Sequence, residues 1–237
     1  MKYKLTENTV QETLVIPLYG RKMCSERYPA LYRDETAIRL IDQIDYDFAA
    51  LEKKSGGLMQ RFGVLEAAMR QTDLAFEVRD YLKTHPNAAV VNLGCGLDDT
   101  AWFSRIDTSG GAVFFAAGVF YYFLKEQVRA LVQQMAEAFP GGVLVFDAAN
   151  EKAVRLMLKT WIKDAAIQDV GAYFAVADAR RELSAWDRRL HVSSRGYMLG
   201  YNDLKDPSVS GFFRFLSRIG DNRMNMQTVK IGFGDRR

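Results

Sequence analysis

One short segment, AAVVNLGCGLDD (Ala88 to Asp99), constrains the fold of this chain more than any other. It begins with a continuous apolar run of strand length and then turns at glycines, which is the pattern of a parallel β-strand buried on both faces. The segment before it, Met59 to Lys83, has apolar residues at helical spacing and ends before His85-Pro86, because a residue that precedes proline disfavours helix. A long helix that feeds a buried parallel strand predicts an α/β protein, in which ligands bind at the carboxyl end of the sheet.

Strand and helix signals alternate after this segment. We expect two further parallel strands within GAVFFAAG (111–118) and GGVLVFDAAN (141–150), with a helix over 124–139 between them. A helix follows at 151–165. The last two strands are expected within 184–199 and 225–234, around a helix near 211–219, and an antiparallel pair suits them.

The N-terminal region is expected to be helical. Asn8 can cap a helix over 9–26, which Pro17 should kink or split, and Asp34 can cap a helix over 35–44. With no repeat and no low-complexity linker in the chain, we predict a helical cap over 1–60 and one α/β unit over 61–237.

The glycine turn can bring backbone close to a ligand, but it does not match the dinucleotide fingerprint. That fingerprint needs G-x-G-x-x-G and an acidic residue about 20 residues later. Here Asp99 occupies the third glycine position, and the region near Phe114 and Phe115 is apolar. A nicotinamide or flavin dinucleotide site is therefore not predicted, and the turn taken alone is also compatible with a purely structural role.

Composition excludes several other classes of function. The 32 basic and 29 acidic residues are scattered along the chain, so no basic patch indicates nucleic acid. Two cysteines and two histidines without metal-ligand spacing predict neither a metal site nor a disulfide framework. The N-terminus lacks the apolar core of a signal peptide, and no apolar run reaches the roughly 18 residues of a membrane span. We expect a cytoplasmic protein with no membrane partner.

Several segments in the same order resemble one family. They are VQETLVIPLYGR, IDYDF, AMRQTDLAFEVRDYLKTHPNAAVVNLGCGLDD, FFAAGVFYYF and FPGGVLVFD, followed in the tail by YFAVADARRELSAW and MQTVKIGFG. Together they are similar to the leucine carboxyl methyltransferase family, on the side of the tetracenomycin-type polyketide O-methyltransferases. These are class I enzymes that use S-adenosylmethionine (SAM), so the resemblance implies their Rossmann-like sheet.

The resemblance also implies a set of site residues. Arg70 matches the arginine that pairs with the methionine carboxylate of SAM, a contact suited to a planar guanidinium; an exposed helical charge is the alternative. The loop that binds SAM would be formed by Gly94, Gly96, Asp98 and Asp99. The segment beside the transferred methyl group would contain Gly118, Val119 and, as the catalytic candidate, Tyr122. The neighbouring Tyr121 is equally compatible with a core position. By analogy, the acceptor pocket would use Tyr19, Tyr28, Tyr32 and the segment 197–201.

This chain departs from the family pattern at two points. In DDTAWFSRID (Asp98 to Asp107) the first loop joins directly onto a segment that the family places just before its fourth strand. About 50 residues would be missing, more than one βαβ unit at about 30 residues each. The acid that binds the ribose would be missing with them. Three explanations of the gap are open: natural shortening, an engineered deletion, or residues omitted from the sequence. Ala117 stands where the family commonly has glutamate.

The shortened pattern makes a structural prediction. The family sheet has the strand order 3-2-1-4-5-7-6, so loss of strands two and three leaves the order 1-4-5-7-6. The first strand, AAVVNLG, then becomes an edge strand without a lysine or proline to discourage pairing. We expect a homodimer through this strand, and coverage of the edge by a repositioned helix is the alternative.

Two functions remain. The first is a SAM-dependent O-methyltransferase that acts on a small-molecule hydroxyl or carboxylate. The second is a catalytically impaired methyltransferase-fold protein that serves as a binding or interaction scaffold, which the missing ribose acid and Ala117 favour.

Overall fold

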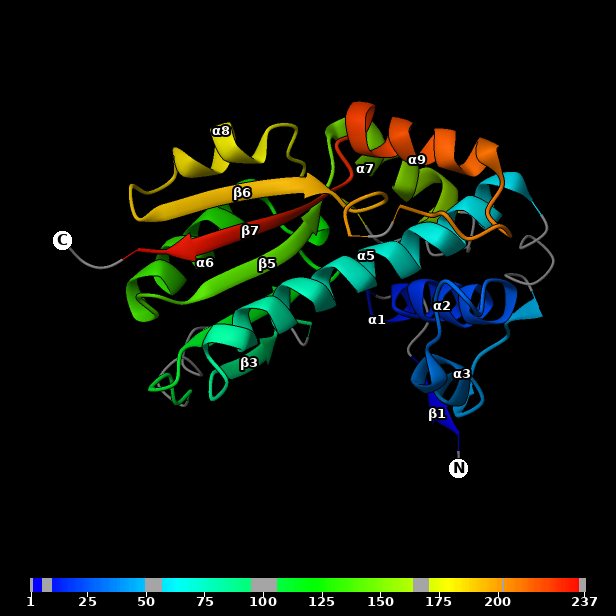
Figure 1. Ribbon diagram of the computed structural model, residues 1–237, viewed down its shortest axis with the longest axis horizontal. Coiled ribbons are helices and arrows are strands. Elements are labelled where there is room, and N and C mark those ends of the chain that lie inside the picture. Colours follow the sequence, from blue (N-terminus) through cyan, green and yellow to red (C-terminus); the bar gives the residue numbers. More distant parts are fainter. Residues whose placement is uncertain are drawn as a thin grey trace.

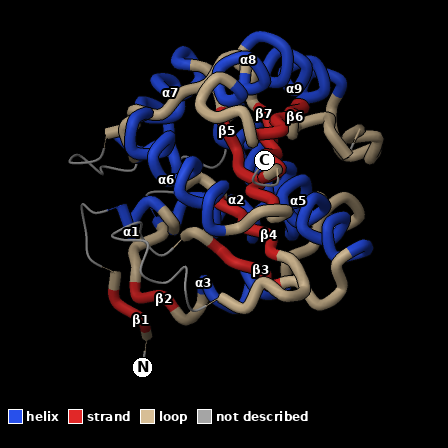
Figure 2. The backbone as a smooth tube through the Cα atoms, turned by 90° about the vertical axis from the view of Figure 1, so that its left-hand side faces the viewer, coloured by secondary structure: helices blue, strands red, loops and turns tan. Residues whose placement is uncertain are grey.

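A computed structural model describes residues 2–5, 10–49, 57–94, 106–163, 171–201 and 203–234. Its centre is a five-stranded sheet with α5 (Leu58–Thr84) on one face and α6 (Lys125–Ala138) on the other, as Figures 1 and 2 both show. The N-terminal helices pack against one end of α5, beyond the sheet (Figure 1). The chain is thus a layered α/β protein, as its sequence predicts.

The sheet mixes parallel and antiparallel strands. Across the sheet they are β3 (Ala89–Asn92), β4 (Ala112–Ala116), β5 (Val143–Ala148), β7 (Gln227–Phe233) and β6 (Leu190–Gly196). The first three pair in parallel, whereas β7 pairs antiparallel with both β5 and β6. Over the described residues this order corresponds to the predicted 1-4-5-7-6, and the predicted antiparallel terminal pair is confirmed.

The expectation that the first strand is buried on both faces is wrong. Along β3 the side chains alternate between half-buried and exposed, and Val90 is 47% exposed. Among the described residues β3 pairs with β4 alone and forms the edge of the sheet. By contrast, every residue of β5, which has a neighbour on each side and helices above and below, is buried.

Two apolar layers hold the sheet between its helices. On one face Phe114, Leu144 and Phe146 pack with residues of α6, including Val132 and Met135. On the other face a smaller cluster joins α5 to the middle strands, through Leu74, Tyr81, Val113, Val143 and Val145. The alternation of these strand residues between two faces is the period-two pattern of a central strand.

The remaining helices flank this core. They are α7 (Glu151–Met157), which continues into the π-helical segment η3 (Leu158–Lys163), α8 (Ala179–Ser184) and α9 (Gly211–Arg223). The N-terminal elements are β1 (Tyr3–Lys4), α1 (Val10–Thr13), α2 (Val15–Arg27), α3 (Glu35–Ile41) and β2 (Ile44–Asp45), with β1 and β2 paired in parallel. Because α5 runs through both regions, the division at residue 60 stays a prediction.

Two local signals in the N-terminal region act as expected. The helix is split between α1 and α2 at Leu14. Pro17 explains the position of this break, because its ring excludes the carbonyl four residues earlier, that of Thr13. Asp34 caps α3 by accepting the N–H of Ala37 at 2.8 Å. Asn8 lies outside the described residues.

A polar network fixes the segment after β6 against α5 and α9. Asp221 of α9 accepts the N–H groups of Met198 at 3.0 Å and Leu199 at 2.9 Å. On α5, the buried Asp73 accepts from Tyr201 N at 3.2 Å and pairs with Arg195 at 3.2 Å. This segment carries Tyr197 toward the centre of the molecule, so the network positions one wall of the cavities described below.

We expect Asp221 to make stability depend on pH. Burial, together with the nearby Asp73 carboxylate, raises the pKa of Asp221 to about 6, although the two N–H donors act to lower this pKa. The pKa of an aspartate in the unfolded chain is near 3.9. Its contribution to stability is therefore complete below about pH 4 and is lost as the pH rises through about 6. Between these two pH values the free energy of unfolding of wild type should fall by about 1–2 kcal/mol relative to that of Asp221→Asn, after allowance for solvent screening at this half-buried site. Urea unfolding measures this difference. Parallel pH profiles for the two proteins would contradict this.

Two further findings bear on function. In the part of the chain that the structure describes, no helix combines the length and apolar character needed to cross a bilayer. Over the same residues, no group of three or more histidine, cysteine, aspartate or glutamate side chains is arranged to hold a metal ion.

Candidate active site

The candidate site lies where the carboxyl ends of β4 and β5 meet the middle of α5. Arg70 of α5 and Asp147 of β5 form an ion pair, with 3.3 Å between Nη1 and Oδ2. The side chain of Asp147 is 1% exposed and that of Arg70 is 15% exposed. Burial alone would lower the pKa of Arg70, but the Asp147 carboxylate raises it above its ordinary value, so the guanidinium stays charged.

The turn after β4 completes this cluster through its backbone. Gly118 donates its N–H to the second carboxylate oxygen of Asp147, Oδ1, at 2.6 Å. Its φ is +68°, a left-handed conformation that favours glycine, and a Cβ here would lie 3.3 Å from Arg70 Nη1. Glycine therefore lets the turn approach the guanidinium closely.

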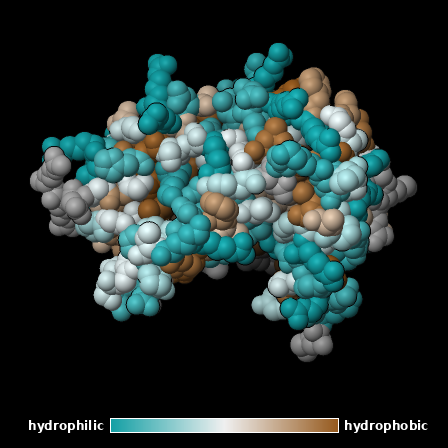
Figure 3. All heavy atoms as spheres, viewed as in Figure 1, coloured by the Kyte–Doolittle hydropathy of each residue, from teal (hydrophilic) through white to brown (hydrophobic). Residues whose placement is uncertain are grey.

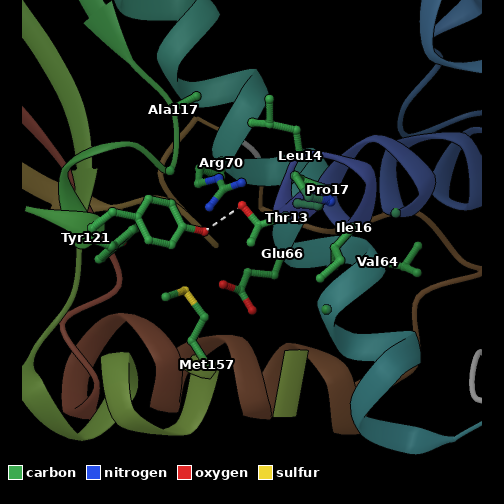
Figure 4. A pocket seen from close by; sticks show the side chains of 15 residues that line it. Thr13, Leu14, Ile16, Pro17, Val64, Glu66, Arg70, Ala117, Tyr121 and Met157 are labelled. Carbon is green, nitrogen blue, oxygen red and sulfur yellow. Dashed lines mark hydrogen bonds between the residues drawn. The ribbon is translucent and has the colours of Figure 1, made fainter. Parts of the chain in front are cut away.

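A cavity of about 90 Å³ opens beside this cluster, and we call it the cap cavity (Figure 4). It lies between the N-terminal helices, α5 and the end of β4. Its walls come from α1 and α2 or the residue between them (Thr13, Leu14, Ile16, Pro17, Gly20), from α5 (Gly63, Val64, Glu66, Ala67, Arg70), from the segment after β4 (Ala117, Gly118, Tyr121, Tyr122) and from Met157. Most of these side chains are apolar, so the cavity can exclude water from its few polar groups.

A second cavity, of about 140 Å³, adjoins the first, and we call it the methionine cavity. Its apolar walls come from α5, α7, α9 and the segments beside them, and they include Met59, Phe62, Val154, Leu156, Leu216, Ile219, Met224 and Met226. Four residues line both cavities: Glu66, Arg70, Tyr121 and Met157. Glu66, Arg70 and Tyr121 thus form the polar part of the wall that the two cavities share.

Burial raises the pKa of several groups in and beside the shared wall. Burial raises the pKa of Glu66, against the Arg70 cation and the hydroxyl of Tyr197, which donates to Glu66 Oε1 at 3.0 Å. Burial and the Asp147 carboxylate raise the pKa of Tyr121 well above its ordinary value. Burial and Glu66 act likewise on Tyr197. These phenols remain hydrogen-bond donors at neutral pH.

Tyr122, the catalytic candidate, belongs to the short 3-10 turn η2 (Phe120–Tyr122) and lines the cap cavity. Its hydroxyl donates to Thr13 Oγ1 at 3.0 Å, the hydrogen bond drawn in Figure 4. Burial raises its pKa, against this hydrogen bond. Tyr122 thus joins the N-terminal helices to the end of β4.

The structure brings some of the predicted site residues together and not others. Arg70, Gly118 and Tyr122 meet around the cap cavity, and the alternative of Arg70 as an exposed helical charge does not hold. Val119 packs against the core between the sheet and α6. Gly94 follows β3, and its N–H bonds to the side chain of Asn92 at 3.1 Å. Gly96, Asp98 and Asp99 lie outside the described residues.

The predicted acceptor pocket is only partly placed at the cavities. Tyr197 lines the methionine cavity. Tyr19 instead stacks on Phe48, and Tyr32 donates to Asp34. Tyr28 is buried in the core beside α2 and α5.

The sequence reasoning overlooked two carboxylates of the site. Asp147 ends the apolar run GGVLVFD, and a charged residue inside a buried strand signals a buried partner. Glu66 stands four residues before Arg70 and therefore on the same face of α5. The sequence contains both patterns, but neither pattern indicates which residue is the partner.

The strand order, together with a charged cluster at the carboxyl ends of parallel strands, defines an α/β protein with a mixed sheet and a candidate ligand site at its carboxyl edge. The more particular similarity is distant. Over 93 residues the chain is 30% identical to the tetracenomycin polyketide synthesis O-methyltransferase TcmP of Streptomyces glaucescens. The match covers 39% of this chain and 32% of TcmP, so it spans about a third of that relative. The resemblance expected from the sequence is confirmed at this level.

A solved structure supports the fold. The crystal structure of a DUF574 family protein from Streptomyces avermitilis matches with a TM-score of 0.50 at 7% identity, over 91% of this chain and 97% of that one. At this identity the likeness concerns the fold alone. No family model matches the chain.

Proposed function

We propose that this protein is a SAM-dependent O-methyltransferase that acts on a hydroxyl or carboxylate of a small molecule. The observation that carries the proposal is the buried cluster of Arg70, Asp147 and Gly118 beside the cap cavity. It lies at the carboxyl ends of parallel strands, where α/β proteins bind ligands. The distant similarity to TcmP supports the same reaction class.

The residues present fit the methionine end of the cofactor. A guanidinium offers five N–H donors, and the ion pair with Asp147 engages Arg70 through Nη1. Arg70 can therefore hold a ligand carboxylate while Asp147 continues to fix its position. Because Gly118 has no side chain, the turn that carries it does not crowd the Arg70 guanidinium. Bound SAM would supply a methyl group activated by its sulfonium.

The chain's own residues would position the acceptor and exclude water. Correct placement of reacting groups is worth up to about 7–11 kcal/mol of a reaction barrier. The apolar walls of the two cavities restrict the acceptor, Tyr122 tethers Thr13 beside the cap cavity, and Glu66 can hold a proton in the shared wall. The acceptor oxygen would lie between these groups.

Calorimetric titration with SAM and with S-adenosylhomocysteine tests this proposal. Without the ribose acid, two hydrogen bonds to an ionised group are lost, so we expect a dissociation constant in the high micromolar range. Arg70→Lys keeps the charge that pairs with Asp147 but not the planar fork, and it should weaken binding about tenfold or more. Arg79→Lys, on an exposed position of the same helix, is the matched control. A folded wild type that binds neither compound would refute the proposal.

One observation favours the second candidate, a scaffold without catalysis. Ala117 lines the cap cavity at the position where the family that this chain resembles commonly has glutamate. A chain that binds neither cofactor form yet remains fully folded in the titration would support this candidate.

A further inference from the structure

The size of the methionine cavity matches a single aromatic ring. Its volume is about 140 Å³, and an apolar protein cavity of about 150 Å³ binds benzene. Two of its lining residues, Met59 and Leu156, are 44% and 39% exposed. Their exposure marks a mouth on the surface, through which a small ligand can enter.

The walls suit an aromatic ring in particular. Met157, Met224 and Met226 line the cavity together with Met59. Methionine thioethers adapt their shape and make favourable contacts with ring edges. An aromatic ring can therefore find complementary contacts on several sides, whereas a polar ligand cannot.

Three polar residues of the methionine cavity, Glu66, Arg70 and Tyr121, belong to the wall shared with the cap cavity. Figure 4 shows the Glu66 carboxyl projecting between Arg70 and Met157. Tyr121 belongs to the same wall, and Tyr197, which lines the methionine cavity, donates its hydroxyl to Glu66 Oε1. A ligand whose ring fills the apolar part would thus present its polar substituent to Glu66.

The charges of this wall favour a neutral substituent. Among the described lining residues Arg70 is the one cation, and it is already paired with Asp147. A ligand carboxylate would lose its hydration in this apolar cavity, where the described lining residues offer no cation besides that paired guanidinium. A hydroxyl can instead donate to Glu66 or accept from a tyrosine. Burial favours the protonated form of Glu66 by raising its pKa, which suits a neutral partner.

From this geometry we propose that the methionine cavity binds a simple phenol, with the ring among the methionines and the hydroxyl at Glu66. The inference rests on the proposed function only in naming this phenol as the methyl acceptor. It narrows the acceptor from a hydroxyl or carboxylate to an aromatic hydroxyl.

Titration of the full chain with phenol and with benzoate, in the absence of SAM, tests the proposal. We expect phenol to bind and benzoate to bind at least about tenfold more weakly, since the benzoate charge would be desolvated in the apolar cavity. Ala153→Leu projects a larger side chain into the cavity from α7 and should weaken phenol binding at least tenfold. Ala130→Leu, on an exposed position of α6, is the matched control and should leave phenol binding unchanged. Equal phenol binding by wild type and Ala153→Leu would overturn the assignment, and tighter binding of benzoate would overturn the preference for a neutral ligand.

Methyl NMR of wild type provides a second readout that needs no variant. Phenol should shift the methyl signals of Met157, Met224 and Met226. The methyl signal of Met135, which is buried between the sheet and α6, should stay unchanged. Shifts at Met135 alone, or none, would refute the site. If phenol binds and SAM does not, the cavity assignment holds and the proposed methyltransferase function fails, so the two are separable.

Discussion

Replacing Arg70 by methionine should lower the free energy of unfolding by about 3–5 kcal/mol, the usual cost of removing one partner from a buried ion pair. The variant leaves the Asp147 carboxylate, which is almost completely buried, with the Gly118 N–H but without the cation. Methionine keeps much of the aliphatic volume of arginine, so a cavity contributes little to this loss. Urea unfolding at neutral pH measures the effect.

A double variant separates the missing charge from other effects of the substitution. Asp147→Asn retains a carbonyl oxygen for the N–H of Gly118, so Arg70→Met combined with Asp147→Asn should recover most of the lost stability. The two sites are in contact, and their effects should therefore be strongly non-additive. Arg79→Met, at an exposed position on the same helix, should change stability by less than about 0.5 kcal/mol. A cost of under about 1 kcal/mol for Arg70→Met would show that solvent reaches Asp147.

Local patterns predicted the elements of this fold well. The helix predicted to end before Pro86 is α5, which ends at Thr84, and Asp34 caps α3 as its residue type predicts. Each of these features depends on residues within about one helical turn. The strand order came from the family resemblance, because no local pattern specifies which strands lie side by side.

Properties that depend on distant neighbours were beyond such patterns. Val90 belongs to an apolar run yet is half exposed, since burial depends on what covers the strand. Arg70 could be placed at the site by resemblance, but its partner Asp147 is 77 residues away. The two cavities are formed by side chains from several helices and from the segments after β4 and β6. A charged residue within an apolar segment of the sequence indicates a buried partner, but only the fold identifies that partner.

The edge position of β3 points to self-association. The N–H groups of Ala89 and Leu93 donate toward β4, at 3.0 and 2.9 Å. Because these groups alternate along a strand, those of Val90 and Asn92 point away from β4. Among the described residues no strand pairs with this side, and Figure 3 shows exposed hydrophobic atoms at the lower left, where Figure 1 places β3. Such an edge is a template for pairing with another strand.

We propose that two chains pair their β3 strands antiparallel about a two-fold axis, and we expect a dimer at roughly tens of micromolar protein. Val90 is the position at which to test this, because it is exposed, whereas Val91 packs against the core. Val90→Lys places a charge beside its own copy across the axis and should raise the dimer dissociation constant by about tenfold or more. Val90→Thr keeps the β-branched shape without the charge and should still dimerise. Light scattering over a dilution series reports the mass. A wild type that stays monomeric throughout, with slow amide exchange at Val90 and Asn92, would mean that this edge is covered within one chain.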